Sequence, residues 1–432
     1  MYTGASIDSS PREVYYHPMH RIKRQNFTAA LICVVLIIFF LTGITSCGRD
    51  GIESLKRESL FSVPIGKAED ELTFFRQESW SFDQDITVRM QDGIVYLAVP
   101  DGFKVMKFNS YGDILELFFN RDKNPPPYLL SGTNEEGTVS NRVAYHYPFN
   151  LIGEIAVADN FDLLVQDEVP KERREFDNDL GVMLDQVVLR FDRSGNFIDY
   201  LGQEGSGGTP FPYIERIQTN HDLDTIVFCR TPRSWIVYWF SHSGYLEYTI
   251  TFNLDRLPLI EDASVPSLET IYADTADSLL YLKIDFYKNR VGEATQARTG
   301  IEYFQSMIYA FDVEEEEYTR VIEIPKNYRS GDSLDFVSLE REQLLYEFTG
   351  TADGGTLVLM SPIEGSYYEL LLLNREGRVM KRAKILLSDQ ELIYRDFFVT
   401  EEGILSGILC TEFAGEVVWW RSDRFIDAER NE

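Results

Sequence analysis

The residues that could ligate a metal ion or act as nucleophiles are few and scattered along this sequence. Its five histidines include no H-E-x-x-H spacing, and its four cysteines include no Cys-x-x-Cys pair. The sequence G-x-S-x-G, which places a serine nucleophile on a strand-to-helix turn, is also absent. We therefore predict no catalytic residues and expect a non-enzymatic role.

Two irregular stretches, 120–150 and 167–186, carry the candidate contacts for a ligand or partner. Long irregular segments on a rigid framework are where binding residues usually lie. Aromatic side chains on both sides of a histidine can form the wall of a pocket. Two neighbouring guanidinium groups can bind an anion or an acidic partner. A second interpretation, that these are ordinary solvated loop residues, stays open. The candidates are Tyr145, His146 and Tyr147 in the first stretch and Arg173 and Arg174 in the second.

The N-terminal region contains an uncharged apolar run at residues 27–46, preceded by Arg21, Lys23 and Arg24. Twenty such residues reach across a bilayer as a helix at ~1.5 Å per residue. Basic residues before an apolar core and small residues after it are typical of a secretory signal peptide. The alternative is an uncleaved anchor with residues 1–26 in the cytoplasm. The residues that represent the apolar core are Phe27, Leu31, Val35, Phe39 and Ile44.

The four residues Ile44-Thr45-Ser46-Cys47 resemble a relaxed bacterial lipobox. In that motif a branched apolar residue and two small residues precede the cysteine that accepts lipid. The resemblance implies that Cys47 is acylated and becomes the mature N-terminus. Ile44 and Ser46 depart from the residues that the motif usually has at these positions, Leu and Ala or Gly.

These observations predict three parts and a location. Residues 1–46 form the signal peptide, 47–71 a polar tether and 72–428 the folded domain, and the true start of translation is placed at Met19. The chain is then expected in the bacterial cell envelope, held to a membrane by lipid or by its N-terminal helix. The folded domain would lie outside the cytoplasm, on the periplasmic side or at the cell surface.

The folded part is strongly acidic. The whole chain has a formal charge of −29, and because residues 1–46 carry a net +2, the remainder carries −31. Such a field repels phosphate backbones, so we expect no nucleic-acid partner. It favours solubility and partners that carry positive charge.

One pattern repeats six times after the tether: a short strand, a turn with acidic or amide residues, and a second apolar strand. A second hairpin with a polar, usually Gly-containing turn follows most copies. Two hairpins make a four-stranded antiparallel blade, and six blades close a ring, so we predict an all-β, six-bladed β-propeller. Seven blades remain an alternative because 120–150 has room for another pair of strands. The copies are 86–99, 155–166, 216–229, 271–284, 346–360 and 397–409.

The first two copies resemble NHL-type propeller repeats. Residues 87–115 have the Asp-Gly turn and the Phe-Asn-x-x-Gly ending, and residues 195–217 have the Gly-rich connector followed by Pro. Together with the lipobox, the chain resembles predicted spirochaetal lipoproteins of unassigned function. Some six-bladed propellers of similar architecture are lactonases or esterases that hold Ca²⁺ in the central channel through residues of different blades. By that analogy the candidate ligands are Asp101, Asp159 and Asn160.

We accordingly expect a lipid-anchored scaffold that presents its loops to an envelope protein partner and needs no cofactor. One rival is a Ca²⁺-dependent hydrolase. Another is a small-molecule or glycan sensor, which predicts a lined pocket at one mouth of the ring.

Overall fold

The computed structural model describes residues 53–74, 86–128, 130, 142–260, 265–291, 298–328, 343–363, 365–387 and 392–430. All of them belong to one compact unit, Glu53–Glu432. The predicted apolar run, with Phe27, Leu31, Val35, Phe39 and Ile44, and the predicted acylation site Cys47 lie outside the described residues. Within the described ranges there is no helix with the length and apolarity that a membrane crossing requires.

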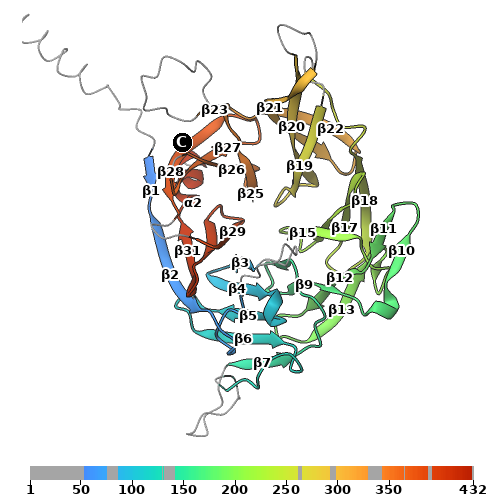
Figure 1. Cartoon of the computed structure of the whole chain (residues 1–432), viewed down its shortest axis with the longest axis vertical. Coiled ribbons are helices and arrows are strands. Elements are labelled where there is room, and N and C mark those ends of the chain that lie inside the picture. The colour runs from blue at the N-terminus through green and yellow to red at the C-terminus, as the bar shows by residue number, and fades with distance from the viewer. Residues whose placement is uncertain are drawn as a thin grey trace, which may run out of the picture. The chain divides into compact units, whose positions relative to one another are not determined.

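The unit is a six-bladed β-propeller, as predicted (Figure 1). Blades one to three contain the following strands in order from the axis outward. Blade one has β3 (Thr87–Gln91), β4 (Ile94–Val99), β5 (Lys104–Phe108), β6 (Ile114–Phe119) and β7 (Val143–His146); blade two has β8 (Ile155–Val157), β9 (Leu163–Glu168), β12 (Gln186–Phe191), β13 (Phe197–Gly202) and β14 (Gly205–Ser206); blade three has β15 (Tyr213–Thr219), β16 (Thr225–Arg230), β17 (Ser234–Phe240) and β18 (Leu246–Asn253).

Blades four to six complete the ring, with β29 of blade six beside β3 of blade one. Blade four has β19 (Val265–Ala273), β20 (Leu279–Val291), β21 (Arg298–Asp312) and β22 (Glu317–Glu323); blade five has β25 (Glu347–Ala352), β26 (Thr356–Pro362), β27 (Tyr367–Leu373), β28 (Val379–Leu386) and β1 (Glu53–Leu55); blade six has β29 (Tyr394–Val399), β30 (Leu405–Cys410), β31 (Ala414–Trp420) and β2 (Arg57–Pro64).

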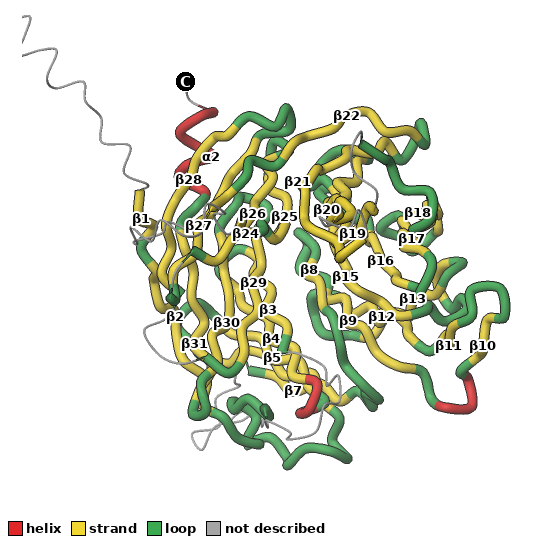
Figure 2. The backbone as a smooth tube through the Cα atoms, turned by 45° about the horizontal axis from the view of Figure 1, so that its top comes forward, coloured by secondary structure: helices red, strands yellow, loops and turns green. Residues whose placement is uncertain are grey.

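A few elements lie outside the blade order. They are the 3₁₀ turns η1 (Pro100–Gly102) and η2 (Lys171–Arg173), the two-stranded sheets β10 (Glu175–Asp177) with β11 (Val182–Leu184) and β23 (Asn327–Tyr328) with β24 (Gln343–Leu344), and the helix α2 (Asp423–Arg430). Figure 2 shows how strands dominate the described backbone, with α2 beside β28 near the C-terminus.

The predicted tether at 47–71 is wrong for residues 53–64, because these residues form strands. β2 is the outermost strand of blade six, where it pairs antiparallel with β31, and β1 pairs parallel with β28 of blade five. An outermost strand buries only one face, so its sequence is half polar and looks like a linker. In β2 only Phe61 and Val63 are buried. β2 therefore completes the last blade of the ring, and β1 extends blade five.

The stretch at 120–150 adds a strand to blade one instead of a seventh blade. β7 pairs parallel with β6 along its outer edge, from Glu116 opposite Val143 to Phe119 opposite His146. Parallel pairing at an outer edge extends an existing sheet and leaves the number of blades at six.

The core lies between the faces of neighbouring blades, and it explains one turn glycine. Phe61 on β2 of blade six packs on Phe108 on β5 of blade one, with ring centroids 5.2 Å apart. Gly112 follows β5 at φ +85°, and a Cβ at this position would lie 2.7 Å from the Cβ of Phe61. Glycine is required there both by the positive φ and by the approach of the closing strand.

Candidate functional site

The turns between the first and second strands of the blades gather at one mouth of the central channel. The blades repeat the same antiparallel order, so the same hairpin of each blade points the same way. Six polar side chains from this mouth, one from each blade, interact with one another. We call them the mouth cluster: Gln91, Asp159, His221, Thr275, Asp353 and Glu401.

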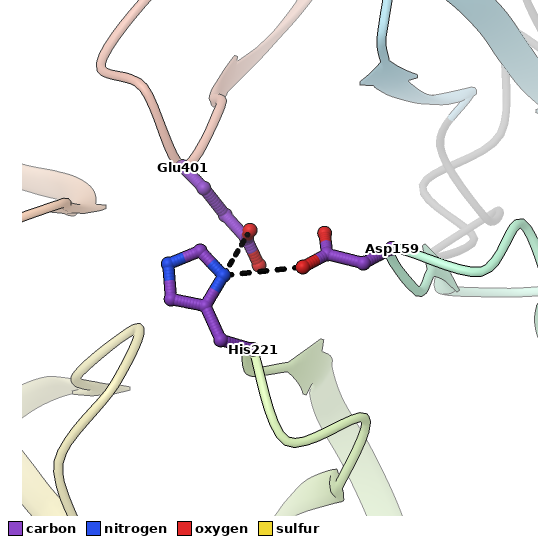
Figure 3. A group of neighbouring side chains, drawn as sticks. All are labelled: Asp159, His221 and Glu401. Carbon is purple, nitrogen blue, oxygen red and sulfur yellow. Dashed lines mark hydrogen bonds and ion pairs between the residues drawn. The ribbon is translucent and has the colours of Figure 1, made fainter.

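His221 is the centre of the mouth cluster (Figure 3). Its ring Nδ1 lies 3.1 Å from Oδ2 of Asp159 and 3.1 Å from Oε2 of Glu401. Its Nε2 lies 2.9 Å from Oδ1 of Asp353. Both nitrogens of one imidazole thus contact carboxylates, and these carboxylates come from blades two, five and six.

The remaining two members hold the carboxylates in place. Gln91 donates from Nε2 to Oδ1 of Asp159 at 2.9 Å, and the Thr275 hydroxyl donates to Oδ1 of Asp353 at 3.3 Å. The loops are also joined through their backbones, since the amide of His221 donates to the carbonyl of Thr275 and the amide of Asp353 donates to the carbonyl of Glu401. Each side chain is therefore positioned by a neighbouring blade.

The carboxylates favour the charged form of His221. Partial burial by itself lowers the pKa of the imidazole. Hydrogen bonds to Asp159 and Asp353, with the nearby charge of Glu401, outweigh burial and raise the pKa from 6.5 to about 9. Burial and the charge of Asp159 raise the pKa of Glu401 from 4.5 to about 8, against the opposing effect of His221. At neutral pH the mouth cluster thus holds an imidazolium among carboxyl groups.

A second acidic site adjoins the mouth cluster. A cavity of about 370 Å³ is lined by residues of blades one, five and six and of α2. Asp353 belongs both to this cavity and to the mouth cluster. One basic side chain, Arg421, lines the cavity. The Nη2 atom of Arg421 lies 2.6 Å from Oδ2 of Asp423. We call this the acidic cavity. Its five carboxylates come from Asp92, Asp353, Glu402, Asp423 and Asp427.

Further along the channel, the inner strands carry charges that are already paired. A cavity of about 110 Å³ is lined there by Arg89, Glu154 and Asp396, among others. Arg89 contacts Oε2 of Glu154 at 2.5 Å and Oδ2 of Asp396 at 3.6 Å. Burial raises the pKa of Asp396 to about 6, while the charge of Arg89 lowers it. This part of the channel is more enclosed and more nearly charge-balanced than the mouth.

The predicted Ca²⁺ ligands do not form one site. Asp159 is in the mouth cluster, whereas Asp101 lies in η1, in the turn at the other end of β4. A six-residue strand separates those ends by ~20 Å. Asn160 interacts within its own turn, where Nδ2 donates to Oδ2 of Asp162 at 2.8 Å. Of the three candidates, only Asp159 lies in a group of side chains from different blades that could hold a metal ion, together with His221 and Glu401.

The predicted aromatic contacts pack at the outer part of blades one and two. Tyr145 stacks on Phe118 with centroids 5.0 Å apart, and Tyr147 packs against Phe149 at 4.9 Å. His146 lies edge-on to Phe119, and its Nδ1 is 3.3 Å from the carbonyl oxygen of that residue. Tyr145 and His146 thus lie away from the axis, on the strand that extends blade one, and Tyr147 follows directly after that strand.

The two predicted arginines interact within blade two. Arg173 lies over the Tyr200 ring at 5.1 Å, and Arg174 pairs with Glu168 at 2.6 Å. They belong to the β9–β12 connection, which leaves the end of β9 opposite to the Asp159 turn. The structure therefore brings neither arginine to the mouth cluster.

Sequence reasoning missed His221, Asp353 and Glu401 as site residues. The sequence nevertheless contained evidence for them, because each of the three residues lies in the polar turn that follows the first strand of a repeat copy. Superposing the six copies would have placed these turns at one mouth.

Comparisons with known proteins leave the function open. No family model and no curated protein matches the chain. Among solved structures, a polysaccharide lyase of family PL25 (ulvan lyase) is 10% identical over 84% of this chain and 83% of its own, with a TM-score of 0.39. The β-propeller domain of the Trilobed protease from Pyrococcus furiosus is 10% identical over 78% of this chain and 95% of its own, with a TM-score of 0.36. The Dos1 propeller is 9% identical over 85% and 95%, with a TM-score of 0.34.

Proposed function

We propose that this chain is a lipid-anchored, non-enzymatic binding propeller of the bacterial envelope that captures a positively charged ligand at the channel mouth. The ligand we propose is a Lys- or Arg-bearing segment of a partner protein. The observation that carries the proposal is the position of Asp353, which contacts His221 on one side and lines the acidic cavity on the other.

The acidic cavity has the charge and the room for a basic side chain. Five carboxylates face one guanidinium, and that guanidinium is already paired with Asp423. Trp419 also lines the cavity, and the Arg421 guanidinium lies over its ring, 5.7 Å from the centroid. Removing a lysine or arginine side chain from water costs free energy unless carboxylates pair with its positive charge, and several carboxylates line this cavity.

The charge of the whole domain supports the same class of ligand. A net −31 beyond residue 46 attracts cationic partners over distances set by the Debye length, ~8 Å at physiological ionic strength. Such steering raises the rate of association of a basic partner and makes it depend on salt. The ring provides a rigid frame for this surface.

The membrane anchor is part of the proposal. The apolar run at 27–46 and the lipobox-like sequence ending at Cys47 support export and acylation, and the first two repeats resemble NHL repeats. Labelling with a radioactive or alkyne-bearing fatty acid tests this part, since Cys47→Ser should abolish incorporation. Incorporation that persists in Cys47→Ser would contradict acylation at this residue.

Binding of a basic peptide tests the mouth. Full-length chain in mild detergent is titrated against fluorescent hexalysine, with hexaglutamate as the probe of opposite charge. We expect Asp353→Asn to weaken hexalysine binding about fivefold to tenfold, because ~1 to 1.4 kcal/mol is lost with one close carboxylate. Glu412→Gln is the matched control: it removes one charge from an exposed turn at the other end of blade six. Equal effects of the two substitutions would show that binding follows net charge alone and would refute the proposed site.

A further inference from the structure

The His221 side chain has the arrangement of a metal ligand held by a carboxylate. Its Nε2–H is directed at Oδ1 of Asp353, 2.9 Å away. When the imidazolium loses one proton, that hydrogen bond favours the tautomer that keeps the other proton on Nε2. The lone pair of Nδ1 then faces Asp159 and Glu401. Histidines that bind metals usually donate the other ring N–H to a carboxylate or carbonyl in this way.

The distances around Nδ1 are those between neighbouring ligand atoms of one small cation. Ligand bonds of ~2.0–2.1 Å at octahedral or tetrahedral angles place adjacent ligand atoms about 2.8–3.4 Å apart. Oδ2 of Asp159 and Oε2 of Glu401 each lie 3.1 Å from Nδ1. The three ligand atoms all lie within 4.8 Å of one another, so small side-chain rotations suffice to close them on an ion.

We propose that the mouth cluster binds one divalent transition-metal cation of the Zn²⁺ class through Nδ1 of His221 and carboxylate oxygens of Asp159 and Glu401. Asp353 is the positioning residue that holds the Nε2–H. The inference rests on the proposed cation-binding function of the mouth and names a second cation for it.

The donor set selects the class of metal. Ca²⁺ takes six to eight oxygen ligands, and Mg²⁺ prefers carboxylates and water. An imidazole nitrogen with two carboxylates suits Zn²⁺, Mn²⁺, Co²⁺ or Ni²⁺. Ca²⁺, the ion of the rival hydrolase interpretation, therefore fits this site less well than Zn²⁺.

The site is open enough for an ion to enter and for water to complete its coordination. The side chains of His221, Asp159 and Glu401 are 40%, 33% and 17% exposed. Three protein ligands leave at least one position for water in a tetrahedral site. Their support by Gln91 and Thr275 limits the reorganisation that binding requires.

Binding replaces one proton with the metal. His221 releases the proton on Nδ1 to solvent and keeps the one on Nε2, so the imidazolium becomes a neutral imidazole.

Zn²⁺ titration of the full-length chain in mild detergent, after chelator treatment and against a chromophoric competitor, tests the inference. We expect one Zn²⁺ per chain with a Kd of about 1 µM or tighter at pH 7.5. His221→Gln and Asp159→Asn should each weaken binding at least tenfold. Co²⁺ should give visible absorption bands that are lost in His221→Gln.

Asp353→Asn separates positioning from ligation. It should weaken Zn²⁺ binding about 10- to 100-fold and still give Co²⁺ bands, because all three ligands remain. His146→Gln is the control, since this histidine lies on β7 away from the mouth. Circular dichroism shows that each variant is folded, and Asp159→Asn provides a second ligand variant if His221→Gln is not.

Two outcomes would overturn the inference: no stoichiometric Zn²⁺ binding, or binding that His221→Gln and Asp159→Asn leave unchanged. Hexalysine binding is measured on the same preparation. If hexalysine binds and Zn²⁺ does not, the metal inference fails and the proposed function stands. If neither binds, both fail.

Discussion

Closure of the ring by β2 makes Phe61 a residue on which the stability of the whole propeller depends. The β2 backbone pairs with β31 of blade six, while the Phe61 ring, only 9% exposed, packs on Phe108 of blade one. One side chain therefore joins the first blade to the last. Phe61→Ala removes that contact and keeps the backbone pairing.

The expected loss is about 3–4 kcal/mol. Withdrawing a nearly buried phenyl ring forfeits ~1.5–3 kcal/mol of transfer free energy, and its pairing with a second ring contributes ~0.5–1.5 kcal/mol. The site cannot collapse easily because it lies between two sheets, and measured Phe→Ala changes in cores are about 3–5 kcal/mol. Ser62→Ala is the control. Ser62 is the next residue along β2, on its exposed face, and should change stability by about 0.5 kcal/mol or less.

Urea unfolding of the full-length chain, followed by tryptophan fluorescence, measures both variants against the parent. We expect Phe61→Ala to lower the midpoint of unfolding and to speed proteolysis within 53–64. A Phe61→Ala chain within 1 kcal/mol of the parent would show that β2 does not secure the ring, and the account of closure would be wrong.

Two further predictions concern buried or clustered charges. The pKa of His221 is higher folded (about 9) than unfolded (6.5), so its stabilisation is complete below pH 6.5 and is lost as pH rises through 9. The full rise in pKa corresponds to ~3.4 kcal/mol, which solvent screening of a 40% exposed side chain reduces to about 1 kcal/mol. Urea unfolding in the presence of chelator should give a lower free energy of unfolding at pH 9.5 than at pH 6, and this decrease should be smaller in His221→Gln. An equal decrease in the variant and the parent would contradict the prediction. Lys104→Met should lower the free energy of unfolding by about 1–3 kcal/mol, because the buried Lys104 ammonium donates to the carbonyls of Ala68 (2.6 Å) and Glu71 (2.7 Å). Faster tryptic cleavage after Lys67 is the expected readout. An unchanged cleavage rate would refute the prediction.

The blades could be predicted because their evidence is local. A strand with one buried face alternates apolar and polar residues, and a tight hairpin needs Gly, Asn or Asp in its turn. The copies beginning at 86 and 155 show both properties, and the structure places β3–β4 and β8–β9 there. The same local reasoning failed for β2, since a short outer strand with two buried residues has too little pattern to distinguish it from a tether.

The candidate site could be predicted only in part. Asp159 was selected because it ends a strand, but Asp101 was selected for the same reason and lies at the other end of its blade. Tyr145 and Tyr147 were selected because aromatic residues in an irregular segment suggest a pocket. They instead pack on Phe118 and Phe149, because β7 adds to the sheet of blade one.

The repeated hairpins, the acidic character and the order of the blades follow from the sequence alone, because they depend on neighbouring residues and on summed charge. The folded structure was needed to show that β2 completes blade six and that Asp159, His221, Asp353 and Glu401 meet. His221 and Asp353 are 132 residues apart in the chain. They come close together because closure of the ring places the corresponding turns of separate blades around one axis. A pattern of neighbouring residues cannot predict a contact between positions so far apart in the chain.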